Sequence, residues 1–482
     1  MTRMSSPTDA IAFTLDGRPR RLPSDTLPTT TLLDWLRGPD ARMTGTKEGC
    51  AEGDCGACTV ALEEPDGARV PINACLVALG QLHGRAIRTV EGLRGPDGAG
   101  PHPIQTLMAG GGATQCGFCT PGIVVTAWAH AREGGDPHEA LAGNLCRCTG
   151  YRPILDAFAR LEDDGTAPPS PVEGTGSSAT FAAPGQTFHR PTSLKETVAL
   201  RAARPDAWLL AGGTDLGLRL SEHREHPPEV ICLLGVPELD VLEASPGGLR
   251  VGAAVSYRRL MAALAAERGF APFADLLRWL GSRQIRGLGT LGGNLGTASP
   301  IGDALPPLLA LGATARLAGP GGAERDLPVA AFLTGYRRNA LASGEVIRDV
   351  WLPRPPDGAV FDCQKLSRRR DQDIAAVGLS VFLLADEEGR VAEARVTHGG
   401  LGPTASRAPG AEAALRGARL SRESLDAAAV ALEAEIAPMT DLRGSAEYRR
   451  VAAGNLLRRV WWRATEVGRA EAAAAAGLAE AA

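Results

Sequence analysis

The chain has 482 residues, more than one hydrophobic core can usually accommodate, so we expect several domains. Its 51 basic and 55 acidic residues give a formal net charge of -4, which argues against nucleic acid or an anionic membrane surface as a partner. The sequence shows no secretory signal and no apolar run near the ~18 residues of a membrane span. We therefore expect a soluble, cytoplasmic protein.

The N-terminal region reads as a small β domain. Residues 11–15 and 20–22 flank an Asp-Gly turn and predict a β-hairpin. Residues 30–36, which open with threonines, predict a short helix. A glycine- and cysteine-rich loop at 44–58 then leads into another predicted strand. We assign this domain to residues 1–95.

The next region changes to a helical pattern. Within 103–161, apolar side chains recur at the spacing of a mostly buried helix. Thr120 followed by Pro121 predicts a helix start with Thr120 as the N-cap. We therefore expect an all-helical domain over residues 96–162.

A segment rich in Pro, Gly, Ser and Thr without periodicity follows at 163–186 and predicts an exposed linker. Beyond it, short apolar runs alternate with helical stretches, which is typical of an α/β domain and which we place at 187–357.

The C-terminal part of the chain has a different order of elements. Residues 377–384 and 391–398 flank a turn and predict an antiparallel strand pair, and helical patterns follow. We assign a separate α+β domain to residues 358–470. The tail at 471–482 has good helix propensity but no capping signal, so we expect it to fray.

Eight of the ten cysteines lie between Cys50 and Cys148, and this clustering favours metal binding over a disulfide framework. The first group has a C-x4-C-x2-C spacing with one further cysteine, which is typical of plant-type [2Fe–2S] clusters. Its members are Cys50, Cys55, Cys58 and Cys75. The loop glycines let backbone N–H groups approach the cluster sulfurs. Zinc is the alternative, but zinc sites usually combine two short cysteine pairs, and this group has one.

The second group combines a C-x2-C pair with a C-x-C pair. Its members are Cys116, Cys119, Cys146 and Cys148. A threonine follows each pair at a predicted helix start, where the helix dipole favours a thiolate or an anionic cluster. The spacing alone leaves a zinc or [4Fe–4S] site possible here. Cys232 and Cys363 lie in apolar or strand-like segments, so we interpret them as buried thiols.

Two glycine-rich segments follow the predicted linker. The first, 209–216 (LLAGGTDL), comes after a predicted strand, and its glycines and threonine could bring backbone amides close to a pyrophosphate. The second, 289–303, adds hydroxyl and amide donors, although its glycines are also compatible with ordinary turns. Neither contains G-x-G-x-x-G, so a Rossmann-type site is not supported.

The segments 44–60 (TGTKEGCAEGDCGACTV), 114–124 (TQCGFCTPGIV) and 144–155 (NLCRCTGYRPIL) resemble the two-cluster N-terminal region of the molybdenum hydroxylase family. Within this family the chain most resembles the xanthine dehydrogenases, in particular the small subunits of bacterial two-chain enzymes. The resemblance covers nearly the whole chain. It implies a multidomain α+β fold with a β-grasp [2Fe–2S] domain, a four-helix [2Fe–2S] domain, an α/β FAD-binding domain and a C-terminal α+β domain.

The same resemblance implies a set of FAD-binding residues. Those for the diphosphate and ribityl chain would be Leu209, Leu210, Ala211, Gly212, Gly213, Thr214, Asp215, Leu216, Thr290, Leu291, Gly292, Gly293 and Asn294. Asp303 would hydrogen-bond farther along FAD, and Leu280 and Ile347 would flank its ring system. Lys365 matches a basic residue near the flavin, and Tyr336 matches an aromatic residue beside the nicotinamide site.

The resemblance also implies a division of labour, in which clusters carry single electrons, FAD collects two and NAD+ accepts a hydride. Oxidation of hypoxanthine and xanthine to urate would occur on a molybdopterin-binding large subunit, so we expect no residue catalytic for hydroxylation in this chain. We expect an α2β2 heterotetramer. Electrons would pass from the second cysteine group to the first and then to FAD, and Gln115 would face the molybdopterin.

Two alternatives remain for the function. The chain could be the same subunit type of another molybdenum hydroxylase, acting on aldehydes or N-heterocycles, because the cluster domains would look alike. It could also be a ferredoxin-like carrier that holds no flavin and whose C-terminal half docks a partner.

Overall fold

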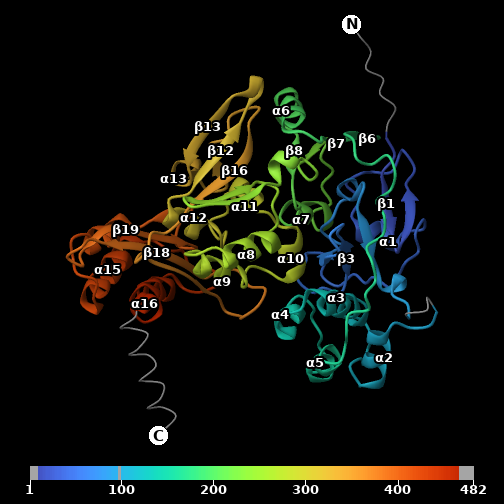
Figure 1. The fold of residues 1–482 in the computed structure, drawn as a ribbon, viewed down its shortest axis with the longest axis horizontal. Coiled ribbons are helices and arrows are strands. Elements are labelled where there is room, and N and C mark those ends of the chain that lie inside the picture. The colour runs from blue at the N-terminus through green and yellow to red at the C-terminus, as the bar shows by residue number, and fades with distance from the viewer. Residues whose placement is uncertain (1–8, 96–98, 466–482) are drawn as a thin grey trace. The chain divides into compact units, whose positions relative to one another are not determined.

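The computed structural model describes residues 9–95 and 99–465 (Figure 1). The chain divides into two compact units. The first consists of the described residues up to Leu239 together with Gly281–Thr290, and the second consists of Asp240–Leu280 together with the described residues from Leu291 onward. The predicted tail at 471–482 lies outside the described residues. The multidomain α+β fold expected from the sequence is confirmed.

The first unit begins with a five-stranded mixed sheet. Its strand order is β2 (Arg18–Arg21), β1 (Ala12–Leu15), β5 (Ala86–Arg88), β3 (Thr59–Glu63) and β4 (Arg69–Asn73). Helix α1 (Leu32–Arg37) begins at the N-cap Thr31, whose side chain accepts a hydrogen bond from the Asp34 amide, as N-cap threonines commonly do. Short 3₁₀ turns lie at Leu79–Leu82 and Val90–Gly92. The sheet holds the first cysteine loop between α1 and β3.

Four helices follow the sheet, and they lie together below it in Figure 1. They are α2 (Pro103–Gly110), α3 (Thr120–Glu133), α4 (Pro137–Leu141) and α5 (Arg152–Phe158). Their apolar core is centred on the fully buried Trp128. Sequence reasoning placed the N-cap of α3 at Thr120, but the cap is Cys119, one residue earlier, because Thr120 already has helical geometry.

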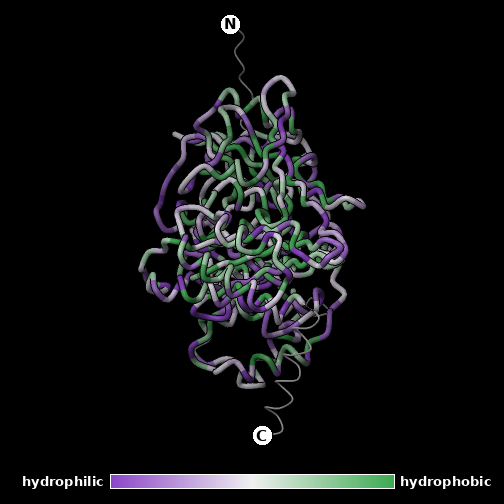
Figure 2. Tube along the Cα trace, turned by 90° about the vertical axis from the view of Figure 1, so that its left-hand side faces the viewer, coloured by the Kyte–Doolittle hydropathy of each residue, from purple (hydrophilic) through white to green (hydrophobic). Residues whose placement is uncertain are grey.

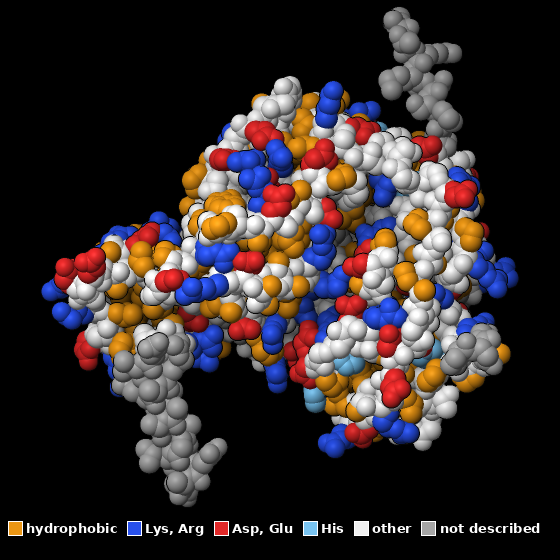
Figure 3. Space-filling model, in the orientation of Figure 1, with side chains coloured by type: hydrophobic (Ala, Val, Ile, Leu, Met, Phe, Trp, Pro, Cys, Tyr) orange, Lys and Arg blue, Asp and Glu red, His pale blue; other side chains and the backbone are white. Residues whose placement is uncertain are grey.

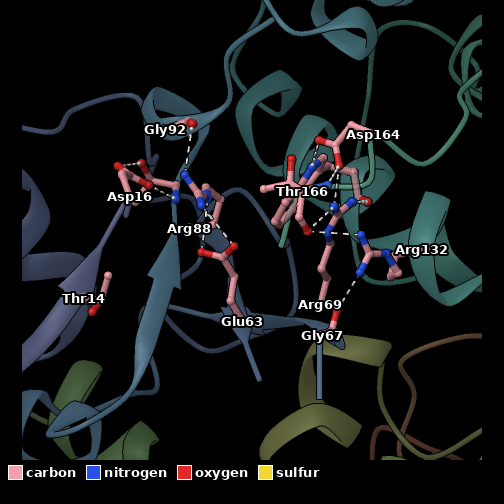
Figure 4. Close-up of polar contacts among 12 residues, drawn as sticks. Thr14, Asp16, Glu63, Gly67, Arg69, Arg88, Gly92, Arg132, Asp164 and Thr166 are labelled. Carbon is pink, nitrogen blue, oxygen red and sulfur yellow. Dashed lines mark hydrogen bonds and ion pairs between the residues drawn. The ribbon is translucent and has the colours of Figure 1, made fainter. Parts of the chain in front are cut away.

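A buried ionic network joins the end of the helical region to strand β4 (Figure 4). Arg69 forms an ion pair with Asp164 and donates a 3.3 Å hydrogen bond to the carbonyl of Thr166. Asp164 also accepts hydrogen bonds from Trp128 Nε1 (2.8 Å) and from His102 Nε2 (3.1 Å). Burial opposes the charge of Asp164, but the hydrogen bonds from His102, the Thr166 amide, Trp128 and Arg69 outweigh it and lower its pKa. The start of the predicted linker is therefore fixed to the sheet and the helices.

A second polar cluster, also drawn in Figure 4, connects strands β3 and β5 and the β1–β2 turn. Arg88 on β5 binds Glu63 on β3 through two hydrogen bonds of 3.0 and 3.1 Å. Asp16, in the β1–β2 turn, accepts hydrogen bonds from the amide (2.7 Å) and hydroxyl (2.8 Å) of Thr89. Such paired, geometrically fixed contacts set the register of neighbouring strands. They tie the hairpin turn to the strand beside it.

A four-stranded sheet completes the first unit. Its order is β6 (Ala179–Ala183), β7 (Gln186–Arg190), β9 (Glu229–Cys232) and β8 (Trp208–Leu210), with helices α6 (Leu194–Ala203) and α7 (Leu216–Ser221) and a 3₁₀ turn at Pro237–Leu239. Strand β6 lies inside the segment predicted as linker, because it pairs with β7 across a Pro-Gly turn. Helix α10 (Arg283–Leu288) also belongs to this unit and packs on β4.

The second unit contains an antiparallel five-stranded sheet. Its order is β10 (Leu242–Ser245), β11 (Gly248–Gly252), β16 (Val346–Pro353), β12 (Thr314–Ala318) and β13 (Glu324–Pro328). The associated helices are α8 (Tyr257–Ala266), α9 (Ala271–Leu277), α11 (Leu291–Thr297), α12 (Leu305–Leu311) and α13 (Val329–Phe332). A 3₁₀ turn at Pro320–Gly322 and a small hairpin of β14 (Leu333–Gly335) and β15 (Arg338–Asn339) are also present.

The C-terminal part of the second unit is an α+β sandwich. An antiparallel sheet in the order β17 (Val360–Leu366), β18 (Val377–Ala385), β19 (Val391–Gly399) and β20 (Ser406–Arg407) packs on α14 (Pro409–Leu415), α15 (Arg422–Glu435) and α16 (Ala446–Ala464). The predicted strand pair is thus confirmed as β18 and β19.

The surface and the hydropathy pattern agree with the composition. Basic and acidic side chains are interspersed over the face seen in Figure 3. Hydrophobic and hydrophilic stretches alternate along the chain (Figure 2). Among the described residues, no helix combines the length and the apolar character needed to cross a membrane.

Candidate functional site

The first cysteine group lies in the loop before β3 and at the end of β4, and its thiols associate two by two. The Cys58 and Cys75 sulfurs are 3.4 Å apart, and the Cys55 thiol hydrogen-bonds to Cys50. The backbone amide of Cys55 also donates to the Cys50 sulfur at 3.3 Å. Gly49 allows this close wrapping, since a Cβ there would lie 2.7 Å from the Cys55 sulfur. The loop therefore directs thiols and amides into one small space.

The second group is held between helix ends and is also paired. Cys116 and Cys148 have sulfurs 3.6 Å apart, and the Cys119 and Cys146 thiols share a hydrogen bond. Tyr151 fixes the position of Cys146, because its hydroxyl accepts a 2.8 Å hydrogen bond from the Cys146 amide. The structure thus brings together all four cysteines that the sequence placed in this group.

The pairing of the thiols indicates which metal centre each cysteine group can bind. A structural zinc site needs four ligands around a single ion. A [2Fe–2S] cluster instead takes four thiolates as two pairs, one pair for each iron. Two pairs in each group therefore fit a two-iron cluster better than a zinc ion.

The two cysteine loops contact each other directly. The Leu145 amide donates a 2.9 Å hydrogen bond to the carbonyl of Cys55. The Asn144 side chain donates to the Gly56 carbonyl at 3.0 Å. Gly56 has φ +65°, and a Cβ there would lie 1.9 Å from the Gly143 carbonyl oxygen. Only a glycine permits this approach. One hydrogen bond therefore connects the backbones of the two groups.

Helix α10 stabilises the contact between the two cysteine loops. Gln284 is fully buried and donates to the Asn144 side chain at 3.0 Å and to the hydroxyl of Thr59 at 3.2 Å. Thr126 on α3 donates in turn to Asn144 at 2.7 Å. The other end of α10 lies at the first glycine-rich segment, where a Cβ on Gly212 would be 1.8 Å from the Leu288 carbonyl oxygen. A single short helix therefore contacts both the cysteine loops and this segment.

The first glycine-rich segment forms the turn between β8 and α7. Gly213 has φ +77°, which favours glycine, and it lies beside the Gln81 side chain. Gln81 donates a 2.8 Å hydrogen bond to the Ala211 carbonyl and so fixes the turn. A Cβ on Gly217 would lie 2.5 Å from the carbonyl oxygen of Leu76, the residue after Cys75. The turn thus packs against the backbone next to the first cysteine group.

Most of the second glycine-rich segment lies in the second unit, and its part Leu291–Thr297 is helical rather than a series of turns. Helix α11 forms despite its glycines because they allow close packing, and a Cβ on Gly292 would lie 2.5 Å from Ala253. Ile347 is buried on β16, near Gly296 of the same segment. Leu280 is buried, whereas Tyr336 is 63% exposed.

Asp303 and Lys365 form a buried ion pair in the second unit. Lys365 Nζ lies 2.6 Å from Asp303 Oδ2 and donates to the Trp279 carbonyl at 2.8 Å. Burial raises the pKa of Asp303, and the neighbouring Lys365 opposes this shift. The other carboxylate oxygen, Oδ1, has no partner among the described residues, and neither has Oδ1 of Asn294. Buried polar atoms without partners fit a site that binds a polar cofactor.

Sequence reasoning missed Tyr257, the first residue of α8. Its side chain is buried, and its hydroxyl has no hydrogen-bond partner in the described structure. Burial raises the pKa of this phenol well above its usual value. The sequence could indicate only that a helix begins after Ser256, because the environment of the hydroxyl depends on distant segments.

Comparisons with known families agree with this geometry. The chain matches the [2Fe-2S] binding domain over residues 89–159, the FAD binding domain in molybdopterin dehydrogenase over 180–355, and the CO dehydrogenase flavoprotein C-terminal domain over 363–464. It is similar to a solved structure of carbon monoxide dehydrogenase from Hydrogenophaga pseudoflava, with 30% identity, a TM-score of 0.54, and coverage of 58% of this chain and 98% of that chain.

The chain belongs to the molybdenum hydroxylase family of oxidoreductases. It carries the [2Fe–2S]-binding and FAD-binding portion of that family.

Other members show the breadth of the family. Xanthine dehydrogenase 2 of Arabidopsis thaliana is 32% identical over 86% of this chain and 37% of its own length, and the xanthine dehydrogenase of Drosophila subobscura is 32% identical over 85% and 36%. A solved quinoline 2-oxidoreductase from Pseudomonas putida 86 is 29% identical, with a TM-score of 0.53 and coverage of 58% of this chain and 97% of that chain. The chain spans little more than a third of the length of these xanthine dehydrogenases.

Proposed function

We propose that this chain is the electron-transfer subunit of a molybdenum hydroxylase whose partner chain binds molybdopterin. The observation that carries the proposal is the arrangement of eight thiols as two pairs in each of two groups, in a chain that also contains the family's FAD-binding domain. Each group would hold one [2Fe–2S] cluster. When bound, such clusters carry single electrons, and FAD exchanges single electrons for pairs.

The exposure of the cysteines suggests the direction of electron transfer. Cys116 and Cys148 are exposed, whereas Cys58 and Cys75 are buried within the first unit. Electrons would therefore enter at the second group, where a partner can approach. The hydrogen bond from Leu145 to Cys55 gives a short route to the first group. Leu76, next to Cys75, then packs on the glycine-rich turn that we assign to FAD.

The chain's own residues would bind FAD in two places. In the first unit, the turn 209–216 offers backbone amides to the diphosphate. In the second unit, the segment 291–294 with Asp303 and Lys365 offers hydrogen-bond donors and acceptors, while Leu280 and Ile347 offer apolar surface. Tyr336 is free in solvent to contact NAD+, which we propose as the electron acceptor.

We propose hypoxanthine and xanthine as the substrates of the partner chain and an α2β2 assembly. Similarity to plant and insect xanthine dehydrogenases, which reaches 32% identity over most of this chain, supports this choice. The similarity to carbon monoxide dehydrogenase and quinoline 2-oxidoreductase supports a different partner substrate as the second candidate.

The test is to purify the native complex and the chain alone under anaerobic conditions. We expect about four iron atoms and one FAD per chain, and two distinct paramagnetic resonance signals from [2Fe–2S] clusters. The complex should reduce NAD+ with xanthine. The chain alone should oxidise NADH with an artificial acceptor but should not hydroxylate xanthine. Bound zinc without iron, or the absence of FAD, would contradict the proposal, and activity of the complex with quinoline but not xanthine would select the second candidate.

A further inference from the structure

Tyr257 occupies an unusual position for a buried tyrosine. Ser256 caps α8 by accepting a hydrogen bond from the Arg259 amide, so Tyr257 is the first residue of the helix. The Tyr257 side chain is only 3% exposed. Buried tyrosine hydroxyls usually have a partner, because an unpaired polar atom loses its hydration without compensation. The Tyr257 hydroxyl has none among the described residues. The position therefore calls for a partner that the chain itself does not supply.

A second buried atom without a partner among the described residues belongs to Asp303, whose charge contributes to the raised pKa of Tyr257. Its Oδ2 contacts Lys365, while its Oδ1 is buried and unpaired in the described structure. Asn294, beside Gly302, adds a third unpaired oxygen, its Oδ1. These atoms belong to α8, to the segment before α12 and to α11, all within the second unit.

The chemistry of these atoms limits what can satisfy them. A protonated phenol donates one hydrogen bond, whereas an ionised carboxylate only accepts. Tyr257 and Asp303 do not bond to each other in the described structure, so a group that bridged them would accept from the phenol and donate to the carboxylate. A phosphate does not fit, because it offers no donor when ionised. A metal cation does not fit, because the Lys365 ammonium already occupies the same carboxylate.

We propose that Tyr257 is a flavin-binding residue, and that its hydroxyl and Asp303 together hold one polar group of FAD that both accepts and donates a hydrogen bond. FAD offers such groups in the hydroxyls of its ribityl chain and at the N3–H and carbonyl edge of its ring. The inference rests on the proposed function, since it adds a residue to the FAD site. Tyr257 would position the flavin and would not take part in electron transfer.

The test compares Tyr257→Phe with Tyr448→Phe in the full chain. Tyr257→Phe removes only the hydroxyl and keeps the ring, and Tyr448 on α16 is half exposed and serves as the matched control. Flavin-free protein is titrated with FAD and binding is followed by quenching of flavin fluorescence. We expect Tyr257→Phe to weaken FAD binding by about tenfold, the effect of one lost buried hydrogen bond, and Tyr448→Phe to leave binding unchanged.

Three further measurements make the result decisive. Asp303→Asn and the double variant complete a double-mutant cycle. Non-additive losses of FAD affinity in this cycle show that both residues hold the same group of FAD. The flavin midpoint potential distinguishes the two FAD groups that Tyr257 could hold. A potential that shifts in Tyr257→Phe indicates the ring edge, and an unchanged potential indicates the ribityl chain. Iron content reports folding of the first unit and melting reports that of the whole chain. If Tyr257→Phe binds FAD as the wild type does, with additive effects in the cycle, the inference is wrong. If the wild type binds no FAD, the proposed function itself fails.

Discussion

The guanidinium of Arg69 lies 3.9 Å from the centre of the Trp128 ring, and both side chains are fully buried. Strand β4 and helix α3 are thereby joined by a cation–π contact that excludes water. The same guanidinium pairs with Asp164, so the first turn of the predicted linker is part of the folded core of the first unit. The stability of this unit should therefore depend on a residue that composition assigns to a linker.

We expect Asp164→Asn to lower the free energy of unfolding by about 3 kcal/mol at pH 7, because it leaves a buried guanidinium with a weaker partner. The pKa of Asp164 is depressed, so the ionised carboxylate stabilises the fold above its unfolded pKa of about 3.9. The difference between wild type and variant should then narrow as the pH falls below about 4. Denaturant unfolding at pH 7 and pH 3 measures this. Asp163→Asn is the control and should cost less, since Asp163 is a third exposed. Equal losses at both pH values would contradict the expectation.

Gly56→Ala should disrupt the contact between the two cysteine loops. The new Cβ would meet the Gly143 carbonyl oxygen at 1.9 Å, and the left-handed backbone disfavours alanine. Overpacking of this kind typically costs about 1 to 3 kcal/mol. We expect a lower melting temperature and reduced iron content. Gly110→Ala is the matched control, because nothing lies within 4 Å of its Cβ position and its φ is not positive. A Gly56 variant with the iron content of the control would argue against tight contact between the loops.

Serine substitutions in the two cysteine groups should separate their roles. Cys148→Ser replaces a soft thiolate with a hard hydroxyl, so the complex should lose the signal of the second group and xanthine-dependent NAD+ reduction, while NADH oxidation by the FAD-loaded chain survives. Cys55→Ser should also stop NAD+ reduction but leave the second group reducible by xanthine. Paramagnetic resonance after addition of xanthine distinguishes these cases.

Cys232→Ala serves as the control for both serine variants, because Cys232 lies on β9 and belongs to neither cysteine group, so both signals should remain intact. FAD content must match the wild type in every variant. An intact second group that xanthine fails to reduce in Cys55→Ser, with an active molybdenum centre, would reverse the proposed order.

Lys365→Met should make the stability of the second unit decrease as the pH rises from the acidic range. Without Lys365, the pKa of the buried Asp303 rises further, so the folded state binds a proton that the unfolded state releases. The free energy of unfolding of FAD-free protein should therefore fall as the pH rises above about 4, by about 3 to 5 kcal/mol in total. Adding Asp303→Asn should remove most of this loss and its pH dependence. A double variant as unstable as Lys365→Met alone would show that the ion pair is not the cause.

The sequence predicted features that depend on local pattern. The segments that became β18 and β19 are apolar-rich and flank a turn, so their pairing could be foreseen. The cysteine spacing likewise grouped the thiols as the structure does. Helix α11 was not foreseen, because its glycines disfavour a helix by about 1 kcal/mol each and only packing against Ala253 reverses that preference.

Other features depend on contacts between distant segments. Strand β6 has the composition of a linker and becomes a strand by pairing with β7. The Tyr257 hydroxyl is buried without a partner in the described structure, so a helical pattern can predict the burial of this residue but not the chemistry of its hydroxyl.

The position of helix α10 determines where the chain can be truncated without loss of folded structure. It follows the linker by about a hundred residues, yet it belongs to the same compact unit as the cysteine loops. A fragment ending before the linker would lack Gln284 and expose the side chains of Asn144 and Thr59 that Gln284 now covers. Proteolysis or truncation at the linker should therefore yield a poorly soluble N-terminal piece. A peptide covering residues 281–290, supplied in trans, should rescue that piece.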